Sequence, residues 1–139
     1  MEKEQHSAKE AFAPSTNRAN YVQNMFGSIA NRYDFMNSIM TGGQHHFWRR
    51  LAAEEVVKPG DIVVDVGCGT GDLSFACLQQ SASQAIGIDF ARPMLPIALD
   101  KAKKFSLKNK FAATVGDATS LPIANESVDI WCSAFVIRN

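Results

Sequence analysis

The sequence lacks several features that would assign it to a protein class at once. Its three cysteines are an odd number and form no C-x-x-C pair, which argues against a disulfide scaffold or a zinc site. No apolar run reaches the ~18–20 residues of a transmembrane helix. The first residues also lack the basic-then-apolar order of a signal peptide. We therefore expect a cytoplasmic protein whose contact with a membrane is at most peripheral.

An excess of charge of one sign is also missing. Fourteen lysines and arginines balance fourteen aspartates and glutamates, with no basic stripe and no acidic tail. We therefore expect no nucleic-acid partner. With 139 residues, 46% of them hydrophobic, the chain is long enough to bury roughly two-thirds of its unfolded surface in one core.

The spacing of apolar residues predicts helices in the first part of the chain. Residues 1–19 are polar and are expected to form a flexible lead-in. Five apolar residues then recur at helical spacing: Phe26, Ile29, Tyr33, Met36 and Met40. Gly42-Gly43 breaks this helix, and a second helix is expected over 46–57. Residues 20–58 are thus predicted to be a helical region that caps a substrate.

From residue 59 onward the pattern changes to strands that alternate with helices. A β-branched run at 61–66 without a polar face is typical of a buried parallel strand. Further strands are expected at 85–89, 111–115 and 127–136, with helices over 72–80 and 94–105. This alternation predicts an α/β fold, a Rossmann-like, doubly wound and mostly parallel sheet over residues 59–139.

A glycine-rich loop follows the first predicted strand and opens the next helix. It reads D-V-G-C-G-T-G-D, with Asp65, Gly67, Gly69, Thr70 and Gly71 as candidate cofactor-binding residues. A dinucleotide fingerprint would need glycine at position 72, where an aspartate stands. Carboxylates beside the loop would disfavour a diphosphate but suit a ligand with a cationic amino group and sulfonium. The loop therefore favours S-adenosyl-L-methionine over NAD, and a dinucleotide oxidoreductase is a distant alternative.

Two further strand ends carry acidic residues. Asp89 ends the second predicted strand, where an acid can accept hydrogen bonds from both hydroxyls of a ribose. Met94, just beyond, could pack on the adenine ring, although core packing is an equally simple role for it. Asp117-Ala118 follows the third strand and could receive the adenine amino group. We expect these residues to meet at the carboxyl edge of the sheet, and we expect no metal ion.

The flanking segments resemble one family among the class I methyltransferases. Residues 25–50 match its N-terminal signature: M-F-x-x-I-A-x-x-Y-D-x-M-N-x-x-M-T-x-G-x-H-x-x-W-R-R. Residues 135–139, F-V-I-R-N, are similar to its F-G-L/I-R-N segment. The chain thus resembles the UbiE/MenG methyltransferases. The resemblance implies methylation, by S-adenosyl-L-methionine, of a ring carbon of a prenylated quinol on the menaquinone or ubiquinone route.

The resemblance also implies roles for particular residues. Thr70, Asp89, Asp117 and Ala118 fall where the family binds its cofactor. Arg138 and Asn139 fall where it is thought to activate the ring, with the arginine holding a phenolate or orienting a water.

The N-terminal signature supplies the candidate residues on the substrate side. Tyr33 and Met36 belong to the apolar stripe that could cover a prenyl chain, and His45 is a candidate base; core packing is the alternative for each. Arg49 and Arg50 are candidates for contact with lipid headgroups.

The chain departs from the family pattern at three positions and in length. Ala134 stands in place of a serine that contacts the cofactor, Val136 in place of a glycine, and Gly42 in place of an aromatic residue. Because the sequence stops directly after the second signature, we expect a fragment whose fourth strand is an open edge, which leaves a homo-oligomer open. Two alternatives are a methyltransferase for another small molecule and a truncated, non-catalytic module that binds the cofactor.

Overall fold

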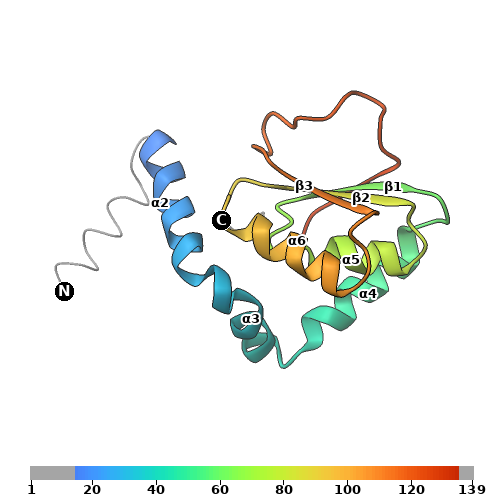
Figure 1. The fold of residues 1–139 in the computed structure, drawn as a ribbon, viewed down its shortest axis with the longest axis horizontal. Helices are drawn as coiled ribbons and strands as arrows, with labels where there is room; N and C mark the ends of the chain where they lie inside the picture. The colour runs from blue at the N-terminus through green and yellow to red at the C-terminus, as the bar shows by residue number, and fades with distance from the viewer. Residues whose placement is uncertain (1–14, 135–139) are drawn as a thin grey trace.

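The structure, a computed structural model, describes residues 15–134, and its side chains are described from residue 19. A parallel sheet and the helices beneath it form the larger part, and two further helices lie to one side (Figure 1). No helix in residues 15–134 is long and apolar enough to cross a membrane.

The sheet has four parallel strands in the order β3-β2-β1-β4. Their bounds are Ile62–Val66 for β1, Gln84–Asp89 for β2, Phe111–Val115 for β3 and Ile130–Cys132 for β4. The central strand β1 is buried from Val63 to Val66, as its β-branched run predicts. The parallel order confirms the predicted Rossmann-like sheet, in which the chain reverses direction of winding between β1 and β4.

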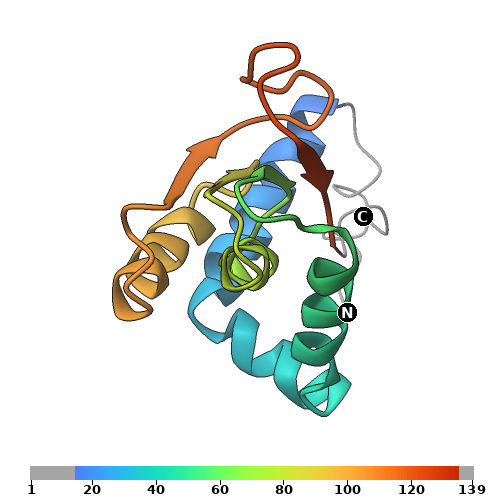
Figure 2. The same ribbon diagram turned by 90° about the vertical axis from the view of Figure 1, so that its right-hand side faces the viewer.

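Three helices cover one face of this sheet: α4 (Gln44–Val56), α5 (Asp72–Gln79) and α6 (Met94–Lys104). Their main apolar cluster includes Phe75, which makes edge-to-face contacts with Phe105 and Phe111. The loop of residues 116–129 arches over the other face (Figure 2). There Leu121, Ile123 and Val128 pack against β1 and β2, so this loop closes the core where a helix would otherwise lie.

The N-terminal region forms a cap of three short elements: α2 (Ser15–Ile29), η1 (Ala30–Arg32) and α3 (Tyr33–Thr41). Gly42 and Gly43 follow with φ of 58° and 79°, so the predicted break falls where two residues take the left-handed conformation. We use the name cap for residues 15–41 below.

Several predicted element bounds are corrected. Residues 15–19 belong to α2 rather than to a flexible lead-in, and residues 1–14 lie outside the described part. The single helix expected over the stripe is interrupted by η1, so the far members of the stripe, Met36 and Met40, are exposed on α3. The second helix begins two residues earlier than predicted, at Gln44.

The fourth strand was predicted to begin at residue 127 but begins at Ile130. Asp129 precedes it and exchanges hydrogen bonds with the start of β1: its carboxylate accepts from the Ile62 N–H, and its own N–H donates to the Ile62 carbonyl. This exchange places the loop–strand boundary after residue 129. The division of the chain at residues 19 and 58 stays a prediction.

Candidate functional site

A cavity of about 230 Å³ opens at the carboxyl edge of the sheet, under the cap. The sheet side contributes the ends of β1, β2 and β3, and the cap contributes α2 and α3. The residues that line it are Val22, Phe26, Tyr33, Val66, Gly67, Gly69, Ile88, Asp89, Phe90, Ala91, Met94, Gly116, Ala118 and Ala134. Open α/β sheets bind ligands at this edge, beside the point where the strand order reverses. The cavity is therefore the candidate site.

Asp89 is the acidic residue of this cavity, and the backbone orients it. One carboxylate oxygen accepts from the Gly69 N–H at 2.6 Å, and the other accepts from the Ala91 N–H at 2.7 Å. Burial raises the pKa of Asp89, although these two hydrogen bonds oppose the rise. Each oxygen keeps a lone pair for a ligand, so a carboxylate stands ready to accept hydroxyl groups at the end of β2.

The glycine loop turns sharply between β1 and α5. Gly67, Gly69 and Gly71 have φ of 73°, 54° and 90°, a region that residues with a Cβ rarely adopt. Gly67 and Gly69 line the cavity, whereas Gly71 lies against α5, where an added Cβ would stand 2.8 Å from the Phe75 ring. Gly67 and Gly69 therefore let the backbone approach a ligand, and Gly71 permits the helix to pack.

The two acids that flank this loop do not line the cavity itself but line the small pocket beside it, so their place at a cofactor stays a prediction. The Asp65 carboxylate is buried and accepts from the Ser74 N–H and hydroxyl at 3.1 and 2.8 Å. Asp72 pairs with Lys101 and, at 3.4 Å, with Arg49. Their charges are thus directed into α5 and the helical layer.

Thr70 lies beside the cavity rather than in it. With Asp65 it lines a much smaller pocket that shares Gly67, Gly69 and Tyr33 with the cavity. Its hydroxyl donates to Asp34 at 2.5 Å and accepts from Lys101 at 3.1 Å. The side chain of this predicted cofactor residue is therefore bonded to the cap and to α6.

The loop after β3 contributes small residues, rather than an acidic side chain, to the wall of the cavity. Ala118 and Gly116 line the cavity, but Asp117 does not. The Asp117 carboxylate instead accepts from the Thr119 N–H and hydroxyl, and these hydrogen bonds lower its pKa. Met94 lines the cavity and is also part of a small cluster with Ala30 and Ala91, so it joins the site to the cap.

The predicted substrate residues are separated by the structure. Tyr33 lines the cavity and meets Phe26 edge to face, while Met36 is exposed on the outer side of α3. His45 lies buried at the start of α4, lines neither the cavity nor the small pocket, and has Nδ1 2.7 Å from the Thr41 hydroxyl. Because that hydroxyl donates to the Asn37 carbonyl, it accepts from Nδ1–H, which leaves Nε2 with a bare lone pair.

A possible metal group also includes His45. One ligand atom from each of His45, His46 and Asp72 lies within 4.8 Å of the others, and Nε2 of His45 has no hydrogen-bond partner among residues 15–134. Burial, together with the charges of His46 and Arg49, lowers the pKa of His45. Because Lys101 and Arg49 already occupy the Asp72 carboxylate, they repel a second cation there. We therefore assign no metal to this group.

The predicted catalytic pair, Arg138 and Asn139, lies outside the described residues, and so does Val136. Reasoning from the sequence missed Val22 and Phe90 on the cavity wall and Asp34 beside Thr70. An acidic residue next to Tyr33 in the N-terminal signature was a signal for Asp34. Nothing in the local sequence distinguishes Val22 or Phe90.

Comparison with known proteins identifies the family. The model of the ubiE/COQ5 methyltransferase family matches residues 15–139, which include the cap, the glycine loop and both predicted signatures. The chain belongs to the ubiE/COQ5 methyltransferase family. This result confirms the resemblance inferred from the two signatures.

Individual members of the ubiE/COQ5 family are similar over most of the chain. The ubiquinone/menaquinone biosynthesis C-methyltransferase UbiE of Cereibacter sphaeroides is 33% identical over 128 residues, 91% of this chain and 51% of its own length. The 2-phytyl-1,4-naphtoquinone methyltransferase of Synechocystis is 36% identical over 85% of this chain and 51% of its own. The demethylmenaquinone methyltransferase of Lactobacillus johnsonii is 36% identical over 85% of this chain and 50% of its own. The chain thus spans about half the length of the curated relatives it matches.

Solved structures agree on the fold that this ubiE/COQ5 member adopts. A protein of Methanococcus maripaludis with the fold of an S-adenosyl-L-methionine-dependent methyltransferase has a TM-score of 0.70 at 21% identity, over 81% of this chain and 51% of its own. A geranyl diphosphate methyltransferase solved with S-adenosyl-L-methionine has a TM-score of 0.54 at 20% identity, over 60% and 36%. At these identities the likeness shows the fold, a Rossmann-like class I methyltransferase sheet.

Proposed function

We propose that this chain is the cofactor half of an enzyme that transfers a methyl group from S-adenosyl-L-methionine to a ring carbon of a prenylated hydroquinone. The observation that carries the proposal is the membership of the ubiE/COQ5 family together with a cavity at the carboxyl edge of the sheet, centred on Asp89. The named relatives act in quinone biosynthesis, which supports a quinol as the substrate.

The residues of the cavity fit this cofactor. Gly69 approaches the space without a Cβ, and an added one would stand 3.8 Å from the Tyr33 ring across it. Phe90 and Met94 offer apolar surface for an adenine ring, and Asp89 offers two oriented oxygens for ribose hydroxyls. We assign Gly67, Gly69, Asp89, Met94 and Ala118 to the cofactor side of the site. Asp65, Thr70, Gly71 and Asp117 remain predictions that lie beside it.

Bound S-adenosyl-L-methionine would supply an electrophilic methyl group, and the chain has to align the acceptor and exclude water. The cap does the second task, because α2 and α3 lie over the cavity with Phe26 and Tyr33 facing it. A ring carbon attacks readily when an adjacent hydroxyl is deprotonated, and a cation stabilises the resulting phenolate. Arg138 and Asn139 stay the predicted residues for that step.

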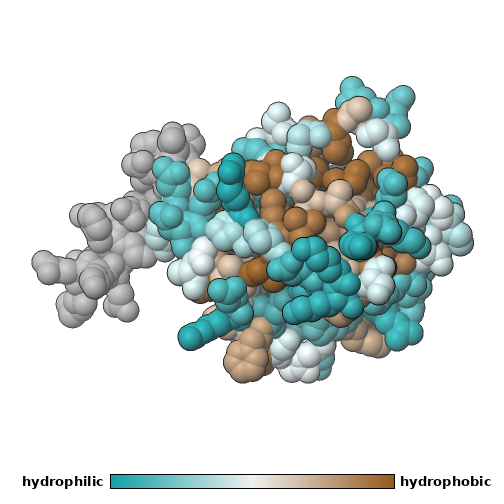
Figure 3. Space-filling view, in the orientation of Figure 1, coloured by the Kyte–Doolittle hydropathy of each residue, from teal (hydrophilic) through white to brown (hydrophobic). Residues whose placement is uncertain are grey.

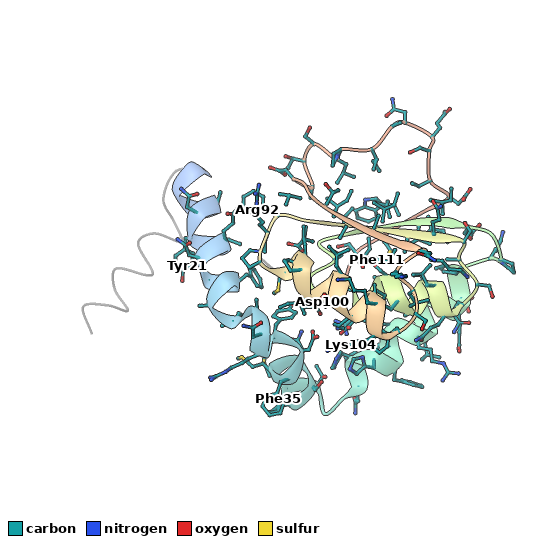
Figure 4. The ribbon with its side chains drawn as sticks, viewed as in Figure 1. Tyr21, Phe35, Arg92, Asp100, Lys104 and Phe111 are labelled. Atoms are coloured by element: carbon teal, nitrogen blue, oxygen red, sulfur yellow. The ribbon has the colours of Figure 1, made fainter. Side chains whose placement is uncertain are left out.

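We also propose that the outer side of α3 lies against a lipid surface, where a prenylated quinol partitions. Phe35, Ile39 and Met40 are 67%, 65% and 77% exposed. Figure 4 shows Phe35 directed away from the sheet, and Figure 3 shows a small light-brown area among paler and hydrophilic atoms at this end, while the larger hydrophobic area lies over the middle of the molecule. Arg50 on α4 is 70% exposed and pairs with Glu54 at 2.8 Å, and we propose that it exchanges this partner for an anionic headgroup. Arg49 is withdrawn from that role, because its side chain is 10% exposed and pairs with Asp72.

The first experiment measures binding of S-adenosyl-L-methionine to the chain by calorimetry. We expect Asp89→Asn to weaken binding at least about tenfold, because one bidentate, charge-assisted acceptor is lost. Asp100→Asn is the matched control, since Asp100 is an exposed acid on α6 that pairs with Lys103. If the folded chain does not bind, or if the two variants bind equally, the proposed cofactor site is wrong.

The second experiment follows the labelled methyl group into a hydroquinone with a prenyl side chain and into the same ring without one. Methylation that depends on the prenyl group supports the proposal. Methylation of the bare ring or of unrelated acceptors alone would favour a methyltransferase for another small molecule. Cofactor binding without turnover by the chain or by a C-terminally extended version would favour a non-catalytic module.

A further inference from the structure

Asp34 joins the cap to the rest of the molecule. It is the second residue of α3, and its two carboxylate oxygens have different partners. One accepts from the Thr70 hydroxyl in the glycine loop at 2.5 Å, and the other accepts from Lys101 Nζ on α6 at 2.8 Å. A single side chain of the cap thus contacts two elements that lie 36 and 67 residues away in the sequence.

Asp34 and its partners form a cluster without net charge, and the members deepest in the molecule are largely withdrawn from solvent. Lys101 also donates to Thr70 and to Asp72, and Arg49 pairs with Asp72 at 3.4 Å. The side chains of Lys101 and Asp72 are 18% and 13% exposed, and that of Asp34 is 37% exposed. Two acids balance two bases, and salt screens the Lys101–Asp72 pair less than it screens a surface pair, because both of its side chains are largely withdrawn from solvent. Asp34 is the acid through which α3 enters this cluster.

The described part of the cap is also held by a small apolar cluster and by hydrogen bonds, among them the one between Thr41 of α3 and His45 of α4. No residue of α3 is buried, and the apolar contact of the cap is a small cluster of Ala30, Phe26 and Tyr33 with Ala91, Met94 and Ile97. Gln23 adds a long hydrogen bond of 3.4 Å to the Phe90 carbonyl. A segment with so little buried surface opens locally at a low free-energy cost unless polar contacts hold it.

The cavity under the cap is also tight. Its volume of about 230 Å³ is below the roughly 300–1,000 Å³ of most small-molecule sites. Because Phe26 of α2 and Tyr33 of α3 form part of its wall, the position of the cap sets how far the site is enclosed. The Asp34 carboxylate, which attaches α3 to α6, also accepts a hydrogen bond from the Thr70 hydroxyl in the glycine loop beside the site.

We infer that Asp34 is a positioning residue for the cofactor site: it latches the cap over the cavity and holds the glycine loop through Thr70 and Lys101. This inference rests on the proposed function only in naming the ligand that the latch encloses. Because the Asp34 carboxylate bonds both elements, the cap closes and the glycine loop becomes ordered together. Loss of these bonds therefore lowers the fraction of molecules that can bind the cofactor.

The test compares Asp34→Asn with Asp100→Asn in the full chain by amide hydrogen exchange and by calorimetry with S-adenosyl-L-methionine. Asparagine keeps the shape of Asp34 but removes the charge that holds Lys101. We expect exchange in residues 20–41 to become about five- to tenfold faster and the cofactor to bind about five- to tenfold more weakly. Exchange in β1 and β2 should stay at the wild-type rate, which a general loss of stability would not allow.

Unchanged exchange in residues 20–41 would overturn the inference, and so would faster exchange that spreads equally through β1 and β2. Thr70→Val is the second variant, read by exchange alone because Thr70 lies beside the cofactor site; it should also loosen the cap. Asp34→Glu keeps the charge and should restore most of the protection. The two proposals fail separately: a cap that loosens in Asp34→Asn, when neither the chain nor a C-terminally extended version methylates a quinol, refutes the function alone, and quinol methylation with an insensitive cap refutes the latch alone.

Discussion

Asp65 illustrates how burial sets the properties of a single residue. Its carboxylate lies at the end of the central strand and accepts two hydrogen bonds from Ser74, so it anchors the first turn of α5. Burial in the apolar layer nevertheless raises its pKa to about 6, with the Ser74 hydrogen bonds acting in the opposite direction. The sequence predicted an acid at this position of the strand, but the direction in which the Asp65 side chain points depends on how α5 packs.

We predict that the effect of Asp65→Asn on stability depends on pH. Because the pKa of Asp65 is about 6 in the folded chain and 3.8 in its ordinary state, the folded chain holds more protons between these values. Its free energy of unfolding therefore falls as the pH rises through this window, by up to about 3 kcal/mol for a shift of this size. The variant has no such loss, so relative to wild type it should gain stability between pH 4 and pH 7.

Urea unfolding at several pH values between 4 and 7 measures this difference. Any cost of burying the extra amide group is the same at each pH, so it cannot imitate the trend. Asp100→Asn serves as the exposed control. A difference between Asp65→Asn and wild type that is constant across the range would contradict the raised pKa.

At the scale of elements, α3 shows the largest departure from the sequence-based expectation. The apolar stripe predicted one continuous helix whose side chains pack together, yet η1 turns the chain before Tyr33. Phe26 before the turn and Tyr33 directly after it line the cavity, whereas Met36 and Met40 farther along α3 are exposed, so the same stripe forms a wall of the site and an exposed apolar surface. Periodicity cannot reveal such a turn, because apolar spacing is the same on both sides of it.

We predict that this exposed surface mediates binding to lipid. A double variant, Ile39→Ser with Met40→Ser, should bind anionic phospholipid vesicles at least about tenfold more weakly than wild type in a sedimentation assay. Each of the two side chains contributes roughly 1.5–3 kcal/mol when it leaves water. The control is Leu99→Ser, which removes an exposed apolar side chain from α6.

Equal vesicle binding by the double variant and wild type would rule out α3 as the contact. A wild-type chain that dimerises through α3 but ignores vesicles would indicate a second copy as the occupant. Binding that is lost in the Leu99→Ser control as well would indicate a general hydrophobic effect rather than a defined surface.

At the scale of the whole molecule, the sheet has an open side. The described strand β4 pairs with β1 through one edge, and no strand in residues 15–134 pairs with its other edge. Trp131, in the middle of β4, is 57% exposed. An unpaired edge strand with an exposed aromatic residue is a template for association with another chain.

We therefore predict that the chain self-associates as its concentration rises and that Trp131→Lys shifts it toward monomer. A lysine on an edge strand opposes pairing with a second copy. Sedimentation velocity over a range of concentrations measures the effect, with Leu99→Lys as the control for an added charge elsewhere. A wild-type chain that stays monomeric at high concentration would refute the prediction.

The sequence by itself determined the parallel sheet, the glycine loop after β1, the acid at the end of β2 and the family. These features depend on local physics: a β-branched run, residues that must take positive φ, and residue types placed at strand ends, where a parallel sheet collects them on one edge. The chain spans about half the length of the curated relatives it matches.

Only the tertiary structure decided which of these residues face the ligand space. Asp89 faces it because two backbone N–H groups orient its carboxylate, whereas Asp65 and Asp72 turn toward α5 and α6, where hydrogen bonds and ion pairs stabilise them. The role of Asp34 appears only where α3, the glycine loop and α6 meet. The direction of each side chain depends on which hydrogen-bond and ion-pair partners are close to it in the folded chain. The spacing of residues along the sequence does not encode these partners.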